Sequence, residues 1–178
     1  NAMSGPGELQ LPGHRPLLLD QGSLGLRIVR GTADLFLVFL DARGRPGRRR
    51  PIASLAEGDV LFHHPSGLEP SHARFLAAGV PETLVRPVGE ADISASDLDR
   101  WIELLHQSIP GAPLPRKYLL LDEAAEPSQF QATKGESVVT KCGVLWIHHR
   151  SGASSFKGSA TAGARGPRVP VSSRGFYQ

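Results

Sequence analysis

The chain has 178 residues, which suits one or two small domains. Its one cysteine cannot form an internal disulfide, which favours a reducing compartment, and no apolar run approaches the ~18 residues that a membrane-spanning helix needs. The formal net charge of +3 is small but unevenly distributed, and 20 glycines with 15 prolines favour short strands and turns over long helices.

The first residues predict little structure. Asn1 and Ala2 ahead of Met3 are interpreted as a tag remnant, and residues 3–15 are polar and rich in glycine and proline. No apolar segment typical of a signal peptide follows Met3. We therefore assign residues 1–16 to a tag remnant and lead-in.

Residues 17–93 predict a first β domain. LRIVRG (26–31) alternates apolar and charged residues as a half-buried strand does, and DLFLVFLD (34–41) is a continuous apolar run typical of a strand buried on both faces. PIASLAEGDVLF (51–62) predicts strand, turn and strand, with Gly58 in the turn. Further strands are expected at 17–22, 73–80 and 82–88, and loops at 42–51 and 64–72.

Residues 94–109 predict one connecting amphipathic helix. Its apolar residues recur at spacings of three and four, which places them on one helical face: Leu98, Trp101, Ile102 and Leu105. Ser96 is the expected N-cap, with Asp99 as its capping-box partner, and Pro110 ends the helix. Trp101 and Trp146 are both expected to be buried as core anchors.

The pattern of the first domain recurs over residues 110–178. RPLLLD (15–20) is echoed by RKYLLLD (116–122), LAEGDVLF (55–62) by ATKGESVV (132–139), and GTADLFLVFLDARG (31–44) by CGVLWIHHRSG (142–152). These short repeats suggest duplication of a β-roll as a hypothesis. Because few apolar residues follow Gly158, we expect the second roll to be truncated and the chain to be a fragment.

Two adjacent histidines, His63 and His64, follow the apolar run that ends at residue 62, and with Glu69 they are the candidate metal ligands. A metal-binding cupin places two histidines one residue apart, because alternate residues of a strand point the same way. Adjacent histidines point to opposite faces, so the alternative is a strand end that enters solvent. The pair His148 and His149 repeats this position after VLWI. We expect no metal and no other cofactor.

Five arginines crowd the loop ARGRPGRRRP (42–51): Arg43, Arg45, Arg48, Arg49 and Arg50. The segment RGRP (43–46) matches the core of an AT-hook, an extended arm that enters the minor groove of DNA. AT-hooks lie in disordered tails, whereas this loop joins two apolar strands. A solvated hairpin is the second interpretation, and contact with an acidic partner or phospholipid head groups is the third. We expect no nucleic-acid partner.

Cyclic-nucleotide binding is a further function to weigh. A roll of that type binds the cyclic phosphate through the backbone amides of a short helix and one arginine. HHPSGLEPSHARF (63–75) offers Arg74 but no Gly-Glu pair, so no working phosphate-binding segment is expected. The serines, histidines and aspartates, together with Cys142, show no spacing that predicts a nucleophile and a base. We therefore assign no catalytic residue and expect a protein that is not an enzyme.

Several segments in a fixed order carry a family resemblance: GTADLFLVFL, the arginine loop, PIASLAEGDVLF, FLAAGVPETLVRPV, DLDRWIELL and KGESVVTKCGVLWIHH. In this order the chain resembles the cytoplasmic N-terminal region of ABC exporters of the nitrile-hydratase-leader microcin (NHLM) type, in the form that lacks a peptidase domain. The family's W-[IV]-x-x-L signature is matched at residues 101–105, and its G-V-L-W-[VI] signature at 143–147. The resemblance covers about residues 17–150.

The resemblance implies a mainly β fold. It consists of a degenerate cyclic-nucleotide-binding-like, cupin-like β-roll over residues 17–93, the connecting helix, and a second, partial β-roll. It also implies partners, namely the membrane and nucleotide-binding domains of a bacteriocin exporter, and a place on the cytoplasmic side of the bacterial inner membrane. No P-loop occurs in the chain, so this part would not hydrolyse ATP.

Recognition of a precursor's leader peptide is our own hypothesis. A sheet edge can accept an extended peptide by strand addition, and the arginine loop would attract acidic leaders. A homodimer is a further possible partner arrangement. Two alternatives come from other classes of protein: a cyclic-nucleotide or other small-ligand sensor, and a metal-dependent cupin enzyme.

Overall fold

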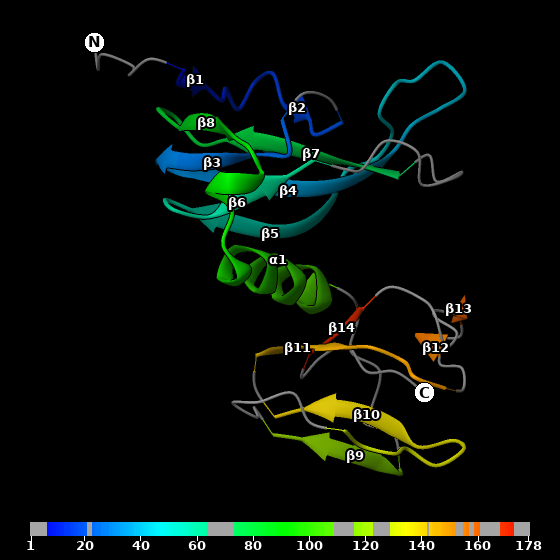
Figure 1. The fold of residues 1–178 in the computed structure, drawn as a ribbon. Helices are drawn as coiled ribbons and strands as arrows, with labels where there is room; N and C mark the ends of the chain where they lie inside the picture. The colour runs from blue at the N-terminus through cyan, green and yellow to red at the C-terminus, as the bar shows by residue number, and fades with distance from the viewer. Residues whose placement is uncertain are drawn as a thin grey trace. The chain divides into compact units, whose positions relative to one another are not determined.

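The computed structural model describes residues 7–20, 23–63, 73–108, 116–122, 129–141, 143–151, 155–156, 159–160 and 168–172. Figure 1 shows a mainly β fold with several antiparallel sheets and, in these residues, one α-helix. The chain divides into two compact units, Asn1–Leu104 (unit 1) and Leu105–Gln178 (unit 2).

Unit 1 contains two four-stranded antiparallel sheets. The first has the order β1-β8-β3-β6, formed by Leu9–Gln10 (β1), Leu84–Val88 (β8), Gly25–Arg30 (β3) and Val60–Phe62 (β6). The second has the order β2-β7-β4-β5, formed by Leu17–Leu18 (β2), Ala73–Gly79 (β7), Thr32–Phe39 (β4) and Arg50–Ala56 (β5). Consecutive strands alternate between the two sheets except β4 and β5, which form a hairpin. Both sheets are open ladders over the described residues.

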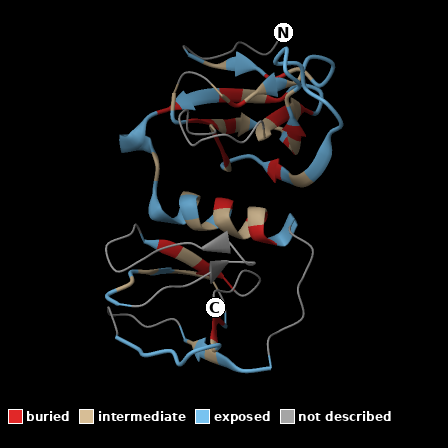
Figure 2. Cartoon of the chain, turned by 90° about the vertical axis from the view of Figure 1, so that its right-hand side faces the viewer, coloured by how far each residue is buried: buried red, intermediate tan, exposed pale blue. Residues whose placement is uncertain are grey.

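The core of unit 1 follows from the alternation of side chains along these strands (Figure 2). The middle of β4 is buried on both faces as expected, because Leu35 and Val38 lie on opposite faces and neither is exposed. The expectation fails at the end of β4, where Phe39 is 52% exposed. That exposure places an aromatic side chain at the base of the arginine loop.

A 3₁₀ turn, Glu90–Asp92 (η1), leads to the helix Ala95–Ser108 (α1). The expected cap at Ser96 is wrong. Ser94 caps the helix, since its Oγ accepts from the Asp97 N–H at 3.2 Å and its own N–H donates to Asp97 Oδ2 at 2.8 Å. The predicted burial of Trp101 is confirmed: its ring centroid lies 5.6 Å from that of Phe62 and 5.4 Å from that of Phe75.

Leu98 departs from the predicted apolar face of α1. It is 38% exposed, whereas Leu104, which was not placed on that face, is buried. The buried stripe of the helix is therefore rotated toward Trp101 and Leu104, which are separated by three positions as one helical face requires.

Unit 2 holds short two-stranded ladders in its described residues. Tyr118–Leu121 (β9) pairs in parallel with Ser137–Thr140 (β10). Val144–Ile147 (β11) pairs antiparallel with Val169–Ser172 (β14). Ser155–Phe156 (β12) pairs antiparallel with Ser159–Ala160 (β13). Val169 and Val171 form a small buried cluster with Ile147. Close to it, His106 Nδ1 lies 2.6 Å from Ser172 Oγ. The second roll stays a prediction.

The echoed segments 55–62 and 132–139 each contain a turn of the same geometry, and these two turns are called the twin turns. At Ala56–Asp59 and at Thr133–Glu136, the first carbonyl accepts the fourth N–H at 3.0 Å, and the fourth carboxylate accepts the first N–H at 2.9 Å. The third residue of each turn is a glycine with positive φ, 92° at Gly58 and 78° at Gly135. The sequence echo therefore corresponds to a repeated backbone geometry, which is in keeping with the duplication hypothesis.

Candidate interaction surface

The arginine loop is an ordered hairpin tip that joins β4 to β5. Here the name arginine hairpin denotes residues 39–50, and the loop between β4 and β5 extends beyond the sheet in Figure 1. An isolated bridge pairs Leu40 with Pro46, and the Gly47 N–H donates to the Phe39 carbonyl at 2.9 Å. Gly44 turns the chain with a φ of 73°, a left-handed value that favours glycine.

Asp41 organises this tip. Its Oδ1 accepts the N–H groups of Arg43 at 2.8 Å and Arg45 at 2.9 Å, and its Oδ2 accepts from Arg45 Nε at 3.0 Å. The Arg45 N–H, together with the Arg43 N–H and the Arg45 guanidinium, holds the pKa of Asp41 below its usual value. The carboxylate therefore remains ionised near neutral pH and holds the turn together.

The structure separates the five predicted arginines into two groups. Arg45 is engaged inside the hairpin, where its Nη2 lies 2.9 Å from Asp41 Oδ2. The side chains of the other four are exposed and have no ion-pair or hydrogen-bond partner among the described residues: Arg43, Arg48, Arg49 and Arg50. The turned backbone at Gly44 and the Arg45–Asp41 pair also differ from the extended arm of an AT-hook.

The outer edge of β5 is a poor template for strand addition. The N–H and C=O of Ala56 both bind Asp59, so they point away from β4, and alternation places those of Ser54 on the same edge. Pro51 has no N–H, and the register shift between Leu35 and Phe36 leaves Ile52 as a bulge. Few outward backbone groups remain, so side chains rather than backbone dominate what this surface can offer.

The candidate metal ligands do not assemble in the part of the chain that the structure describes. His63 lies just after β6 and donates its backbone N–H to the Leu24 carbonyl at 3.0 Å. Both of its ring nitrogens are buried and have no hydrogen-bond partner among the described residues. His64 and Glu69 fall outside the described residues. Within those residues, no three His, Cys, Asp or Glu side chains gather closely enough to hold a metal ion.

Arg74, the arginine weighed for cyclic-nucleotide binding, lies in strand β7. Its Nη1 donates to the Ala73 carbonyl at 2.8 Å. Most of the segment that would have to form the phosphate-binding turn, residues 64–72, lies outside the described residues. Arg74 therefore stays an unassigned candidate.

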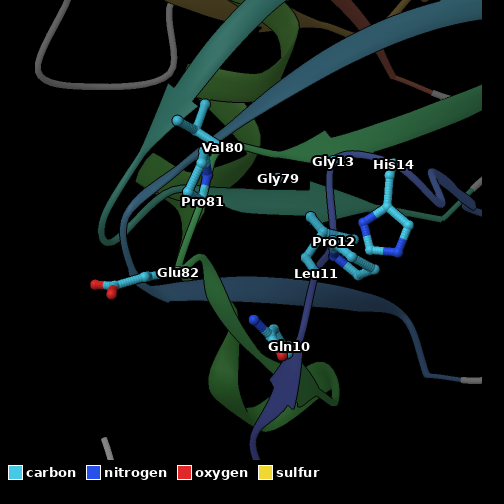
Figure 3. Close-up of a pocket in the computed structure, with 9 residues that line it drawn as sticks. All are labelled: Gln10, Leu11, Pro12, Gly13, His14, Gly79, Val80, Pro81 and Glu82. Atoms are coloured by element: carbon cyan, nitrogen blue, oxygen red, sulfur yellow. The ribbon is translucent and has the colours of Figure 1, made fainter. Parts of the chain in front are cut away.

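A surface groove of about 410 Å³ lies between the segment after β1 and the turn that joins β7 to β8 (Figure 3). It is lined by Gln10, Leu11, Pro12, Gly13, His14, Gly79, Val80, Pro81 and Glu82. A Cβ at Gly79 would collide with the Leu11 carbonyl oxygen, so the two segments are held in close backbone contact. The Thr83 hydroxyl, which donates toward the Thr32 and Val80 carbonyls, fixes the turn. None of the predicted site residues line this groove.

Sequence reasoning missed one strong electrostatic contact in unit 1. Arg27 of β3 forms an ion pair with Asp97 of α1, with Nη2 3.1 Å from Oδ2. Arg27 also donates to the carbonyls of Gly58 and Asp92, each at 2.8 Å. Nothing local could reveal this contact, since 70 positions separate Arg27 from Asp97.

Compared with models of known protein families, with curated proteins and with solved structures, the chain shows no significant match to any of them. No helix among the described residues is long and apolar enough to cross a membrane.

Proposed function

We propose that this chain is a non-catalytic accessory region of a bacterial ABC exporter for bacteriocin-type peptides, and that it recognises the leader segment of the exported precursor. On this proposal unit 1 is a degenerate cyclic-nucleotide-binding-like roll, unit 2 is a second, partial roll, and the partners are the membrane and nucleotide-binding domains of the exporter. The chain would lie on the cytoplasmic side of the inner membrane.

The exporter context rests on the resemblance described above, and two structural features are in keeping with it. A mainly β unit is followed by an amphipathic helix that buries Trp101 of the W-[IV]-x-x-L signature. The twin turns at Gly58 and Gly135 fit two related β units.

Peptide recognition rests mainly on a single observation: an ordered hairpin presents four exposed, unpaired arginines within the described residues. A leader rich in Asp and Glu would meet complementary charge there. Charged side chains at the edge of an interface chiefly raise the rate of encounter and select among partners. Such a role suits a region that must deliver precursors to a transporter.

The proposal is tested with a labelled leader peptide from an NHLM-type precursor and, as control, the core peptide of the same precursor. Fluorescence anisotropy with the parent chain at ~0.15 M salt, where weak charge attraction is well screened, should show binding of the leader and much weaker binding of the core. Equal affinities for both, or no binding of either, would contradict a leader-recognition role.

One observation favours a second candidate, the sensing of a small ligand in unit 1. The buried ring nitrogens of His63 lack partners among the described residues, and a ligand could supply them. Calorimetry with cyclic AMP, cyclic GMP and Zn²⁺ distinguishes the candidates. We expect no binding at micromolar concentration. A micromolar affinity that His63→Ala or Arg74→Ala weakens would favour the sensor.

A further inference from the structure

Positive charge in this protein is concentrated in the arginine hairpin. Residues 39–50 contain five arginines and one aspartate, a formal charge of +4, whereas the rest of the chain has 15 basic and 16 acidic residues and a formal charge of −1. The mild net charge of the whole chain therefore hides a local excess. A local excess of this kind selects a partner at the hairpin rather than over the whole surface.

The tip is also pre-organised. Asp41 binds two backbone N–H groups and the Arg45 guanidinium, so the chain is already turned before any partner arrives. Because Arg45 satisfies Asp41, the aspartate does not compete for the other four arginines. A binder that is ordered beforehand loses less conformational entropy on association.

An exposed aromatic residue adjoins these arginines along the chain. Phe39 is 52% exposed at the end of β4, and its carbonyl accepts the Gly47 N–H at the base of the hairpin. Arginines and an exposed aromatic residue on one hairpin offer both charge and apolar area, the combination that is enriched at protein interfaces.

We infer that the arginine hairpin is a docking surface for an acidic segment of a polypeptide, with Arg48, Arg49 and Arg50 binding its carboxylates. The partner contributes side chains rather than a pairing strand, because Pro51, the bulge at Ile52 and the Ala56–Asp59 turn blunt the adjoining edge of β5. The same features oppose edge pairing with a second copy of this chain. In addition, the arginines of the two copies would repel one another.

A polypeptide fits this surface better than a nucleic acid. Binding along a phosphate backbone requires a basic stripe that neutralises several successive phosphates. The residues outside the hairpin carry a formal charge of −1 and cannot prolong the basic surface as a whole. A short acidic segment needs only the hairpin itself. Duplex DNA and anionic vesicles enter the test as competing partners.

The inference deepens the proposed function by naming its surface and partner chemistry. The probes are a labelled glutamate-rich peptide, its glutamine counterpart, AT-rich duplex DNA, and vesicles that contain phosphatidylserine. The variant R48S/R49S/R50S removes the three arginines. The control R86S/R116S/R150S removes the same charge from exposed positions elsewhere. Circular dichroism verifies that both variants fold.

We expect the glutamate peptide to bind the parent chain, and its affinity to fall about tenfold in R48S/R49S/R50S but less than about twofold in the control. The glutamine peptide should bind the parent about as weakly as the glutamate peptide binds the triple variant. Equal losses of affinity in both variants would show that net charge alone causes the effect, and would overturn the inference. Tighter binding of DNA or vesicles than of the glutamate peptide would also overturn it.

Repeating the titration with the leader peptide separates this inference from the proposed function. A leader that binds the parent and R48S/R49S/R50S alike would leave the proposed function standing and remove this surface. A leader that fails to bind, beside a glutamate peptide that binds through the hairpin, would leave the surface standing and remove the proposed function.

Discussion

Arg27 and Asp97 form a bidentate ion pair across 70 positions of sequence, with Nη1 to Oδ1 and Nη2 to Oδ2 both at 3.1 Å. The Asp97 carboxylate also accepts the N–H of Ser94 at 2.8 Å, so one side chain caps α1 and links it to β3. The two side chains are only 23% and 15% exposed, and solvent screens the pair less than it would a surface pair.

This contact predicts a loss of stability in acid. The hydrogen bonds from Arg27, followed by those from Ser94, lower the pKa of Asp97 to about 2 from 3.8. Because the folded-state pKa lies below the unfolded-state value, the stabilisation is fully present above about pH 4 and is lost as the pH falls toward about 2, a change of about 1–2 kcal/mol. Urea unfolding of the parent and Asp97→Asn between these limits measures it.

Asp97→Asn should unfold at lower urea concentration than the parent at neutral pH and should show a shallower dependence on pH. The exposed Asp122→Asn serves as control and should retain the parent's dependence. A parallel pH dependence in the parent and Asp97→Asn would show that the ion pair contributes little.

The twin turns predict matched responses to substitution. Gly58→Ala and Gly135→Ala should each cost about 1 kcal/mol, because an L-residue is strained at positive φ. The added Cβ meets no atom within 4 Å at either position, so the cost comes from the backbone alone. Thermal unfolding of both variants tests the equivalence. A loss of stability on substitution of one glycine, with no change on substitution of the other, would argue against equivalent turns.

Trp101 should be a major contributor to the stability of unit 1. It is 7% exposed and packs edge-on against Phe75 at an interplanar angle of 81°. Trp101→Ala should cost about 3–5 kcal/mol, as for other buried aromatic residues. Trp146, which the sequence also suggested as a core anchor, is 43% exposed, so that expectation is wrong. Trp146→Ala is therefore the matched control and should cost less. Similar melting temperatures for Trp101→Ala and the parent would refute this assignment.

For His63, unlike Trp101, substitution is not expected to lower the stability of the protein. Because its buried ring nitrogens lack partners among the described residues, His63→Phe should be neutral or stabilising. Urea unfolding of the purified chain measures the effect, and elemental analysis of the same sample records any bound metal. A loss above about 2 kcal/mol would mean that the imidazole has a partner, and about one metal per chain would revive the cupin enzyme.

The strands and the helix were predictable because each leaves a periodic pattern in its own segment. The strands expected at 26–31 and 34–41 correspond to β3 and β4, and Gly58 is in the predicted turn. The helix cap was not predictable from local pattern. Ser94 and Ser96 each precede an aspartate by three residues, and only the distant Arg27 favours Asp97. Whether the sheets close into rolls, which stays a prediction, likewise depends on long-range pairing that no single segment encodes.

Only part of the structure of the arginine hairpin was predictable from the sequence. Its exposure follows from composition, since ARGRPGRRRP has no apolar anchor. That Arg45 differs from the other four depends on Asp41, four residues earlier, and the spacing of this acid–base pair was the available signal. The blunted edge of β5 could not be foreseen, because the bulge at Ile52 exists only in the register with β4.

Hydrogen–deuterium exchange of the parent chain, with and without saturating leader peptide, tests the central claim most directly. Recognition of the leader at the arginine hairpin predicts slower exchange at backbone amides within residues 39–50, where the turn held by Asp41 becomes further ordered, and little change elsewhere in unit 1. Unchanged exchange throughout the chain, or protection confined to other segments, would contradict it.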